Sequence, residues 1–99
     1  MEKLKGSQRK WLRGMAHSLR PVVWLGKHGL TDSTLREIDA ALEIHELIKV
    51  QGASSKEENR EVATRIEERL GAETVGLIGH ILILYRQQPD PERRTLDLP

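Results

Sequence analysis

The chain has 99 residues, no cysteine, only three aromatic residues and a net charge of +1. This length suits one domain with a modest core. Without cysteine it forms no disulfide, carries no thiolate nucleophile and offers no Cys-ligated zinc site. The charged N-terminus lacks the apolar stretch of a signal peptide, and no run approaches the roughly 20 apolar residues of a membrane span. A soluble, cytoplasmic protein with no membrane partner is therefore expected.

The charge is divided unevenly along the chain. Residues 1–30 hold seven Lys/Arg and one acidic residue, a net +6, whereas residues 31–99 hold nine Lys/Arg and fourteen Asp/Glu, a net −5. Such an asymmetry favours a polyanionic partner at the basic end. With so few aromatic residues, nucleic-acid binding would depend on backbone amides and cations more than on base stacking.

The first predicted element is a helix over residues 8–18, capped by Ser7. Its apolar residues recur at helical spacing and are expected on the buried side: Trp11, Leu12, Met15, Ala16 and Leu19. A second stripe is basic, at spacings i, i+3, i+7 and i+10, and its members are candidate RNA contacts: Lys10, Arg13, His17 and Arg20.

Pro21 ends this pattern, and the β-branched and aromatic run over residues 22–25 predicts a buried strand. Trp24 is expected to fill the core, with a stacking surface as the alternative. A second helix is expected from Thr31 to about Ile44, followed by a strand over residues 46–50.

Two basic residues in the predicted strands have two readings each. Lys49 is expected to be a solubilising residue at a sheet edge, or an RNA contact. Arg86, at the end of the last strand, is expected to form either a salt bridge or an RNA contact.

A third helix begins with a capping box, in which Ser55 and Glu58 satisfy each other's free backbone donors, and ends at Gly71. Two further strands, 73–78 and 81–86, are joined by a tight turn and are expected to be antiparallel. Residues 87–99 are polar and contain prolines, which predicts a flexible tail beyond a single domain of residues 1–86.

The order of elements defines the expected fold class. Helix, strand, helix, strand, helix, strand, strand predicts an α/β (α+β) fold, a two-layer αβαβαββ arrangement in which helices pack against a mixed four-stranded sheet.

The candidate site is the loop Gly26-Lys27-His28-Gly29, between the first strand and the second helix. Glycine lets a ligand approach the main chain closely, and peptide N–H groups would point outward beside the positive end of a helix. A phosphate suits that environment, with Lys27 as a mobile cation and His28 as a donor to a phosphate or a 2′-hydroxyl. In KH domains a G-x-x-G loop clamps nucleotide backbone in this way.

Catalysis finds little support in the sequence. His45-Glu46 begins like the zinc motif H-E-x-x-H, but Lys49 stands where the second histidine is needed. No metal site, cofactor or catalytic residue is expected, so the protein is predicted not to be an enzyme. A protein-interaction adaptor, using the acidic third helix or the edge of the C-terminal hairpin, stays open as the alternative to RNA binding.

Several motifs in the same order resemble the CRM domain (chloroplast RNA splicing and ribosome maturation), in its free-standing bacterial YhbY form. They lie within about residues 4–86: Leu12-Arg13-x-x-Ala16-His17-x-Leu19-x-Pro21-Val22-Val23, Leu25-Gly26-Lys27-His28-Gly29-Leu30-Thr31, Ala41-Leu42-Glu43-x-His45-Glu46-Leu47-Ile48-Lys49-Val50 and Ile78-Gly79-x-x-Leu82-x-Leu84-Tyr85-Arg86.

This resemblance implies a fold like the C-terminal domain of bacterial translation initiation factor three. It also implies a non-catalytic RNA-binding protein, with a backbone-gripping loop at residues 26–29. Its expected partner is ribosomal RNA in precursors of the large subunit, whose assembly it would assist. Ribosomal proteins are expected as further partners of a monomeric chain. Trp24 departs from the resemblance, because a smaller or polar residue is expected there.

Overall fold

The computed structural model describes residues 2–53 and 55–99. Three helices, four strands and a short 3-10 turn follow one another in the expected order: α1 (Gly6–Ala16), β1 (Pro21–Trp24), α2 (Asp32–His45), β2 (Leu47–Gln51), α3 (Lys56–Leu70), β3 (Glu73–Ile78), β4 (Ile81–Tyr85) and η1 (Pro91–Arg93). The predicted α/β (α+β) class and its αβαβαββ order of elements are confirmed.

The four strands form one mixed sheet in the order β1-β2-β4-β3. β1 runs parallel to β2, while β4 is antiparallel to both of its neighbours. The expected hairpin of β3 and β4 is therefore confirmed. Lys49 lies in β2, an interior strand, so its predicted place at a sheet edge is wrong.

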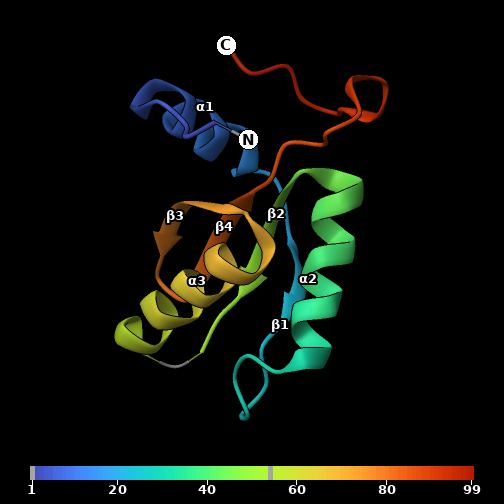
Figure 1. The fold of residues 1–99 in the computed structure, drawn as a ribbon. Helices are drawn as coiled ribbons and strands as arrows, with labels where there is room; N and C mark the ends of the chain where they lie inside the picture. The colour runs from blue at the N-terminus through green and yellow to red at the C-terminus, as the bar shows by residue number, and fades with distance from the viewer. Residues whose placement is uncertain (1, 54) are drawn as a thin grey trace.

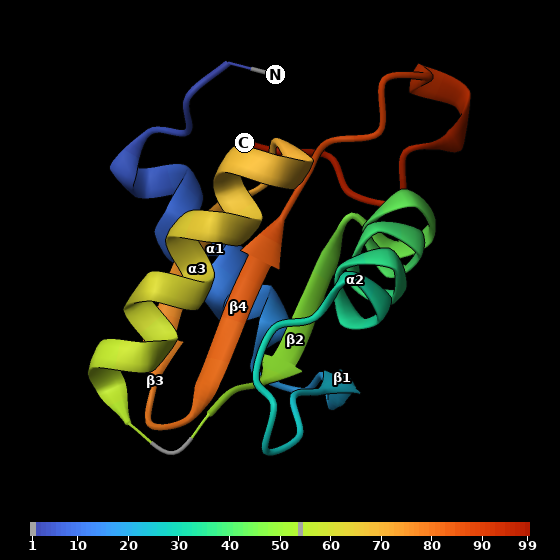
Figure 2. The same ribbon diagram turned by 60° about the horizontal axis from the view of Figure 1, so that its bottom comes forward.

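The helices cover both faces of the sheet, which makes three layers in place of the expected two (Figures 1 and 2). α2 and α3 pack on one face, in a cluster that includes Ile38, Ile66 and Leu84. α1 packs on the other face, in a second cluster with Leu12 and Tyr85. The sheet is thus the middle layer, and each of its faces has its own core.

Local capping chemistry sets the helix starts. The N–H of Thr34 donates to Oγ1 of Thr31 at 3.2 Å, and the N–H of Glu58 donates to Oγ of Ser55 at the same distance. The predicted cap of α1 is wrong, because Ser7 lies inside the helix. There the N–H of Lys5 donates to the side chain of Gln8 at 2.9 Å. At the other end of α3, Gly71 terminates the helix with φ +67°, as predicted.

The prediction of a buried first strand is also wrong. β1 is an edge strand with one covered face, so Val23 is buried whereas Val22 is 44% and Trp24 is 62% exposed. Met15 is 44% exposed, outside the core where it was expected. The reason is tertiary, since α1 packs mainly on β2, β3 and β4 and leaves this side of β1 open.

The chain turns sharply between α2 and β2, at Glu46. This residue has φ +63° and is fully buried. Its carboxylate accepts hydrogen bonds from the N–H of Gln88 at 2.7 Å, the N–H and hydroxyl of Thr95, and the N–H of Leu96 at 3.1 Å. Burial acts to raise the pKa of Glu46, but these hydrogen bonds outweigh it and leave the pKa lowered.

The same hydrogen bonds attach residues 87–99 to the domain. Gln88 is buried, and Leu96 and Leu98 pack against the cluster under α1. The predicted tail therefore has specific contacts with the core in this structure, and its flexibility stays a prediction. Both termini lie at the end of the sheet opposite the loop of residues 26–29 (Figure 1).

Candidate nucleic-acid interface

The loop of residues 26–29 is a tight turn. The N–H of Gly29 donates to the carbonyl of Gly26 at 2.9 Å, and Gly29 has φ +65°, a conformation that glycine adopts readily. Lys27 and His28 occupy the tip and are exposed. Within residues 2–53 and 55–99, their amide N–H groups donate to no protein acceptor.

Open space surrounds both glycines of this turn. A Cβ atom placed on Gly26 or Gly29 would meet no atom of the described residues within 4 Å. A ligand can therefore reach the main chain at the tip without displacing protein atoms. The donors that it would meet are two backbone N–H groups, the Lys27 ammonium and the His28 ring.

The loop forms one wall of a cleft of about 550 Å³. Lys27 and Gly29 line it on one side, and Gln51, Gly52 and His80 line it on the other. Figure 2 shows the loop and the turn between β3 and β4 at the same end of the sheet. The cleft thus joins three connections that are far apart in the sequence.

Gly52 and Asn59 hold the far wall of this cleft. The N–H of Gly52 donates to the carbonyl of His80 at 2.6 Å, and the buried Asn59 side chain bonds both the N–H and the carbonyl of Ala53. A Cβ atom on Gly52 would overlap the Asn59 side chain. Neither residue was predicted to belong to the site, because the only signal in the sequence is a glycine that follows a strand.

The start of α2 contributes less than expected. Oγ1 of Thr31 already accepts the N–H of Thr34, and the carboxylate of Asp32 lies in the first turn. A negative side chain there competes with a phosphate for the positive end of the helix. The free donors at the loop tip, rather than the helix end, are the groups available to an anion.

The predicted basic stripe lies apart from the loop. Lys10, Arg13, His17 and Arg20 are all exposed on α1 and just after it. β1 separates Arg20 from the loop by about 13 Å of strand, at roughly 3.3 Å per residue. Arg13 also has a structural contact, since its Nη1 donates to the carbonyl of Val75 at 2.9 Å.

Lys49 and Arg86 have partners within the protein. Nζ of Lys49 lies 3.0 Å from the carbonyl oxygen of Leu19 and 3.4 Å from that of His17, where a cation stabilises the end of α1. Arg86 forms a 2.7 Å salt bridge with Asp39 and donates to the carbonyl of Leu70. For Arg86 the salt-bridge alternative is confirmed.

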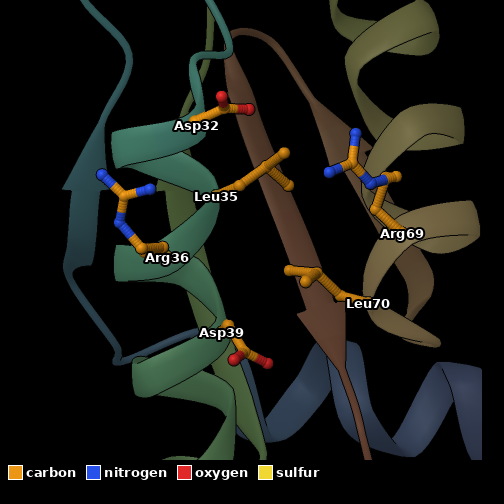
Figure 3. Close-up of a pocket in the computed structure, with 6 residues that line it drawn as sticks. All are labelled: Asp32, Leu35, Arg36, Asp39, Arg69 and Leu70. Atoms are coloured by element: carbon orange, nitrogen blue, oxygen red, sulfur yellow. The ribbon is translucent and has the colours of Figure 1, made fainter.

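The sheet separates the charges of the molecule. α1 carries three Lys/Arg and no acidic residue, whereas α2 and α3 together carry five Lys/Arg against nine Asp/Glu, a net −4. A pocket of about 250 Å³ between α2 and α3 has both signs on its walls, from Asp32, Arg36, Asp39 and Arg69 (Figure 3). A polyanion is therefore favoured on the α1 side.

Membrane-spanning helices and metal sites are both absent from the described ranges, 2–53 and 55–99. No helix there is long and apolar enough to cross a membrane. No group of three or more His, Asp or Glu side chains in the same ranges could hold a metal ion.

A mixed αβαβαββ fold with an exposed G-x-x-G turn defines a class of small domain that fits the resemblance seen in the sequence. The model of the CRS1/YhbY (CRM) domain matches residues 4–86. The chain belongs to this family.

Two curated relatives and one solved structure agree with this membership. A Haemophilus influenzae protein named "RNA-binding protein" is 43% identical, over all of this chain and 98% of its own length. "Probable RNA-binding protein YqeI" of Bacillus subtilis is 35% identical, over 97% of this chain and 99% of its own. The solution structure of the hypothetical protein SAV1595 from Staphylococcus aureus matches 98% of this chain and 100% of its own with a TM-score of 0.85 and 32% identity.

Proposed function

We propose that this chain binds RNA and grips the sugar-phosphate backbone with the loop of residues 26–29. Two relatives of nearly the same length are named as RNA-binding proteins. The observation that carries the proposal is the exposed turn tip, where Lys27 and His28 present backbone N–H groups that have no acceptor among the described residues.

The chemistry of this tip suits a phosphate. Its two N–H groups donate to phosphate oxygens, the Lys27 ammonium neutralises charge, and the His28 ring donates to a phosphate or a 2′-hydroxyl. Such contacts position a protein on RNA without reading its sequence. Selectivity then comes from RNA shape and from groups beside the loop.

The charges of the two faces orient the bound RNA. The exposed cations of α1 extend the footprint from the loop along β1, while the acidic side of α2 and α3 repels the polyanion. Lys10, Arg13, His17 and Arg20 belong to this footprint. Lys49 and Arg86 contribute less, because their cationic groups already bond protein oxygens.

The proposed RNA is ribosomal RNA in cytoplasmic precursors of the large subunit, whose assembly the protein assists without catalysis. Support comes from the CRM family resemblance of the sequence. Ribosomal proteins on the same particle are proposed as further partners of a monomeric chain.

The loop is tested by the salt dependence of RNA binding. Replacing Lys27 and Arg13 by alanine together is expected to reduce the slope of log K against log salt by about 1.4, at roughly 0.7 per lost single-strand phosphate contact. Arg36→Ala, an exposed cation on α2, is the matched control and leaves the slope unchanged. An unchanged slope in the double variant removes both residues from the footprint.

The ribosomal partner is tested in cell lysate on a sucrose gradient. The tagged native protein is expected to co-sediment with large-subunit precursors, and Lys27→Ala/His28→Ala is expected to remain at the top. Migration of both forms at the top contradicts the ribosomal assignment.

A protein-interaction adaptor is the second candidate function, favoured by an apolar groove of about 360 Å³. Met15, Leu19 and Val22 line it together with Leu96. RNA affinity that is weak and insensitive to Lys27 favours this alternative.

A further inference from the structure

A row of side chains crosses the open part of the sheet on the α1 side. Trp24 pairs with Gln51, Gln51 with Ile81, and Ile81 with Ile78. Residues paired across neighbouring strands point to the same face of a sheet. The strand neighbours Val23, Val50, Leu82 and Leu77 belong to the cluster on the opposite face, so this row faces the α1 side.

α1 leaves the two ends of this row open, although Ile81 in its middle packs against the cluster under α1. Trp24 and Ile78, at its two ends, are each 62% exposed, and Gln51 and Ile81 between them are half-buried. By contrast, Ile83 on the same face of β4 is only 2% exposed, under the packing of α1. An exposed tryptophan ring is the kind of surface on which a nucleobase stacks.

The row is continuous with the proposed backbone grip. At most about 11 Å separates the Cα atoms of Trp24 and Lys27, because each of the three residues advances the chain by at most roughly 3.6 Å. Gln51 lies both in the row and in the wall of the cleft beside the loop. On the other side of the row, β1 leads back to Arg20 and the exposed cations of α1.

We infer that Trp24 is a stacking platform for an unpaired base of the RNA that the loop holds. This inference rests on the proposed function and adds a ligand class to it, namely single-stranded RNA next to the gripped phosphate. The carboxamide of Gln51, beside Trp24, makes no hydrogen bond within residues 2–53 and 55–99 and can bond the edge of the stacked base. Bases inside an A-form duplex stay stacked on one another and cannot use the platform.

The test compares a short single-stranded oligoadenylate with an RNA duplex, using the full chain. Trp24→Ala is expected to lose about 5- to 150-fold in affinity for the single strand, the range for removing one stacked base. Its affinity for the duplex and its salt slope stay native, because no charge is lost. Ile44→Ala is the matched control, since Ile44 is also 62% exposed but lies on α2.

Tryptophan fluorescence supplies a direct readout. Saturating oligoadenylate is expected to quench the native protein, and Trp24→Ala, which keeps only Trp11, gives the unquenched reference. Trp24→Phe retains an aromatic ring and is expected to recover most of the affinity. This recovery separates stacking from a structural role of the side chain.

The failures of the two proposals are distinguishable. Native affinity of Trp24→Ala for the single strand overturns the platform, and equal losses on single strand and duplex overturn it as well. In either case a reduced salt slope in the Lys27 variant still supports the loop. If the native protein binds neither probe, both proposals fail, and a protein becomes the expected partner of the exposed row.

Discussion

The backbone N–H groups near the two ends of the sheet differ in whether they have hydrogen-bond acceptors. At one end the N–H groups of Gln88, Thr95 and Leu96 converge on the buried carboxylate of Glu46. At the other end the N–H groups of Lys27 and His28 point from an exposed turn and have no acceptor among the described residues. Both ends contain a residue with φ near +65°, Glu46 at one and Gly29 at the other.

This difference separates a structural corner from a binding corner. Buried donors without partners are costly, so the Glu46 corner satisfies them within the protein. Donors at an exposed turn bond water and can exchange that water for a phosphate. We therefore expect substitutions at the Glu46 end to change stability and substitutions at the loop end to change RNA binding.

The largest expected effect is on the structural corner. Glu46→Ala removes the acceptor of four hydrogen bonds and is expected to lower the free energy of unfolding by about 3 kcal/mol. Urea denaturation measures this, and RNA affinity should stay native. Glu46→Gly loses the same acceptor but relieves the positive φ, so it should be about 1 kcal/mol more stable than Glu46→Ala. Equal stability of Glu46→Ala and the native protein contradicts the assignment.

The wall of the cleft gives the next effect. Gly52→Ala places a methyl group against the Asn59 side chain and is expected to cost about 2 kcal/mol through overpacking. Gly26→Ala is the control, because its Cβ atom meets open space and its φ is not positive. Thermal or urea unfolding measures the stability of both variants. An equal, small loss of stability in both would show that the Asn59 side chain can move away from the added methyl group.

The loop glycine is expected to have a smaller effect on stability. Gly29→Ala costs about 1 kcal/mol because a side chain disfavours φ +65°, with no added clash. It should also weaken RNA binding, since the methyl group projects where the backbone of the RNA approaches. Asparagine tolerates this φ better, so Gly29→Asn separates strain from obstruction. Full RNA affinity in Gly29→Ala would show that Gly29 serves only to form the turn and that RNA does not approach it closely.

The smallest expected effect is the pH dependence of stability, which appears only in acid. Because the pKa of Glu46 is lowered in the folded protein, its contribution to stability is complete above its ordinary value of 4.5. That contribution is lost as the pH falls below 4.5 and through the folded pKa. Stability measured between pH 7 and pH 3 should therefore fall less steeply in Glu46→Gln than in the native protein. Parallel curves show that Glu46 does not titrate differently in the two states.

Local chemistry predicted much of this fold. Thr31 and Ser55 cap helices in the structure as their side chains dictate, and Gly71 ends one. The position of the loop was predicted in the same way, from Gly26 and Gly29 flanking two basic residues. Outward-pointing N–H groups were predicted as well, but the sequence did not show that those of Lys27 and His28 at the tip, rather than those at the start of α2, are the available donors.

The errors share a tertiary cause. Trp24 and Met15 were expected inside, but their exposure depends on where α1 crosses the sheet, and no local pattern records that crossing. Glu46 was expected at the start of a strand and noted in two sequence motifs, but not as a buried acceptor. Its actual role requires residues 87–99, whose polar and proline-rich composition predicted no contact with the core.

The central claim, that the loop end binds RNA while the Glu46 end does not, is tested most directly by amide chemical shifts. The ¹⁵N-labelled full chain is titrated with a short single-stranded RNA. We predict large shifts for the amides of Lys27 and His28, with those of Gln88, Thr95 and Leu96 unmoved. Shifts confined to the amides at the Glu46 end, with those of Lys27 and His28 unchanged, would contradict this claim.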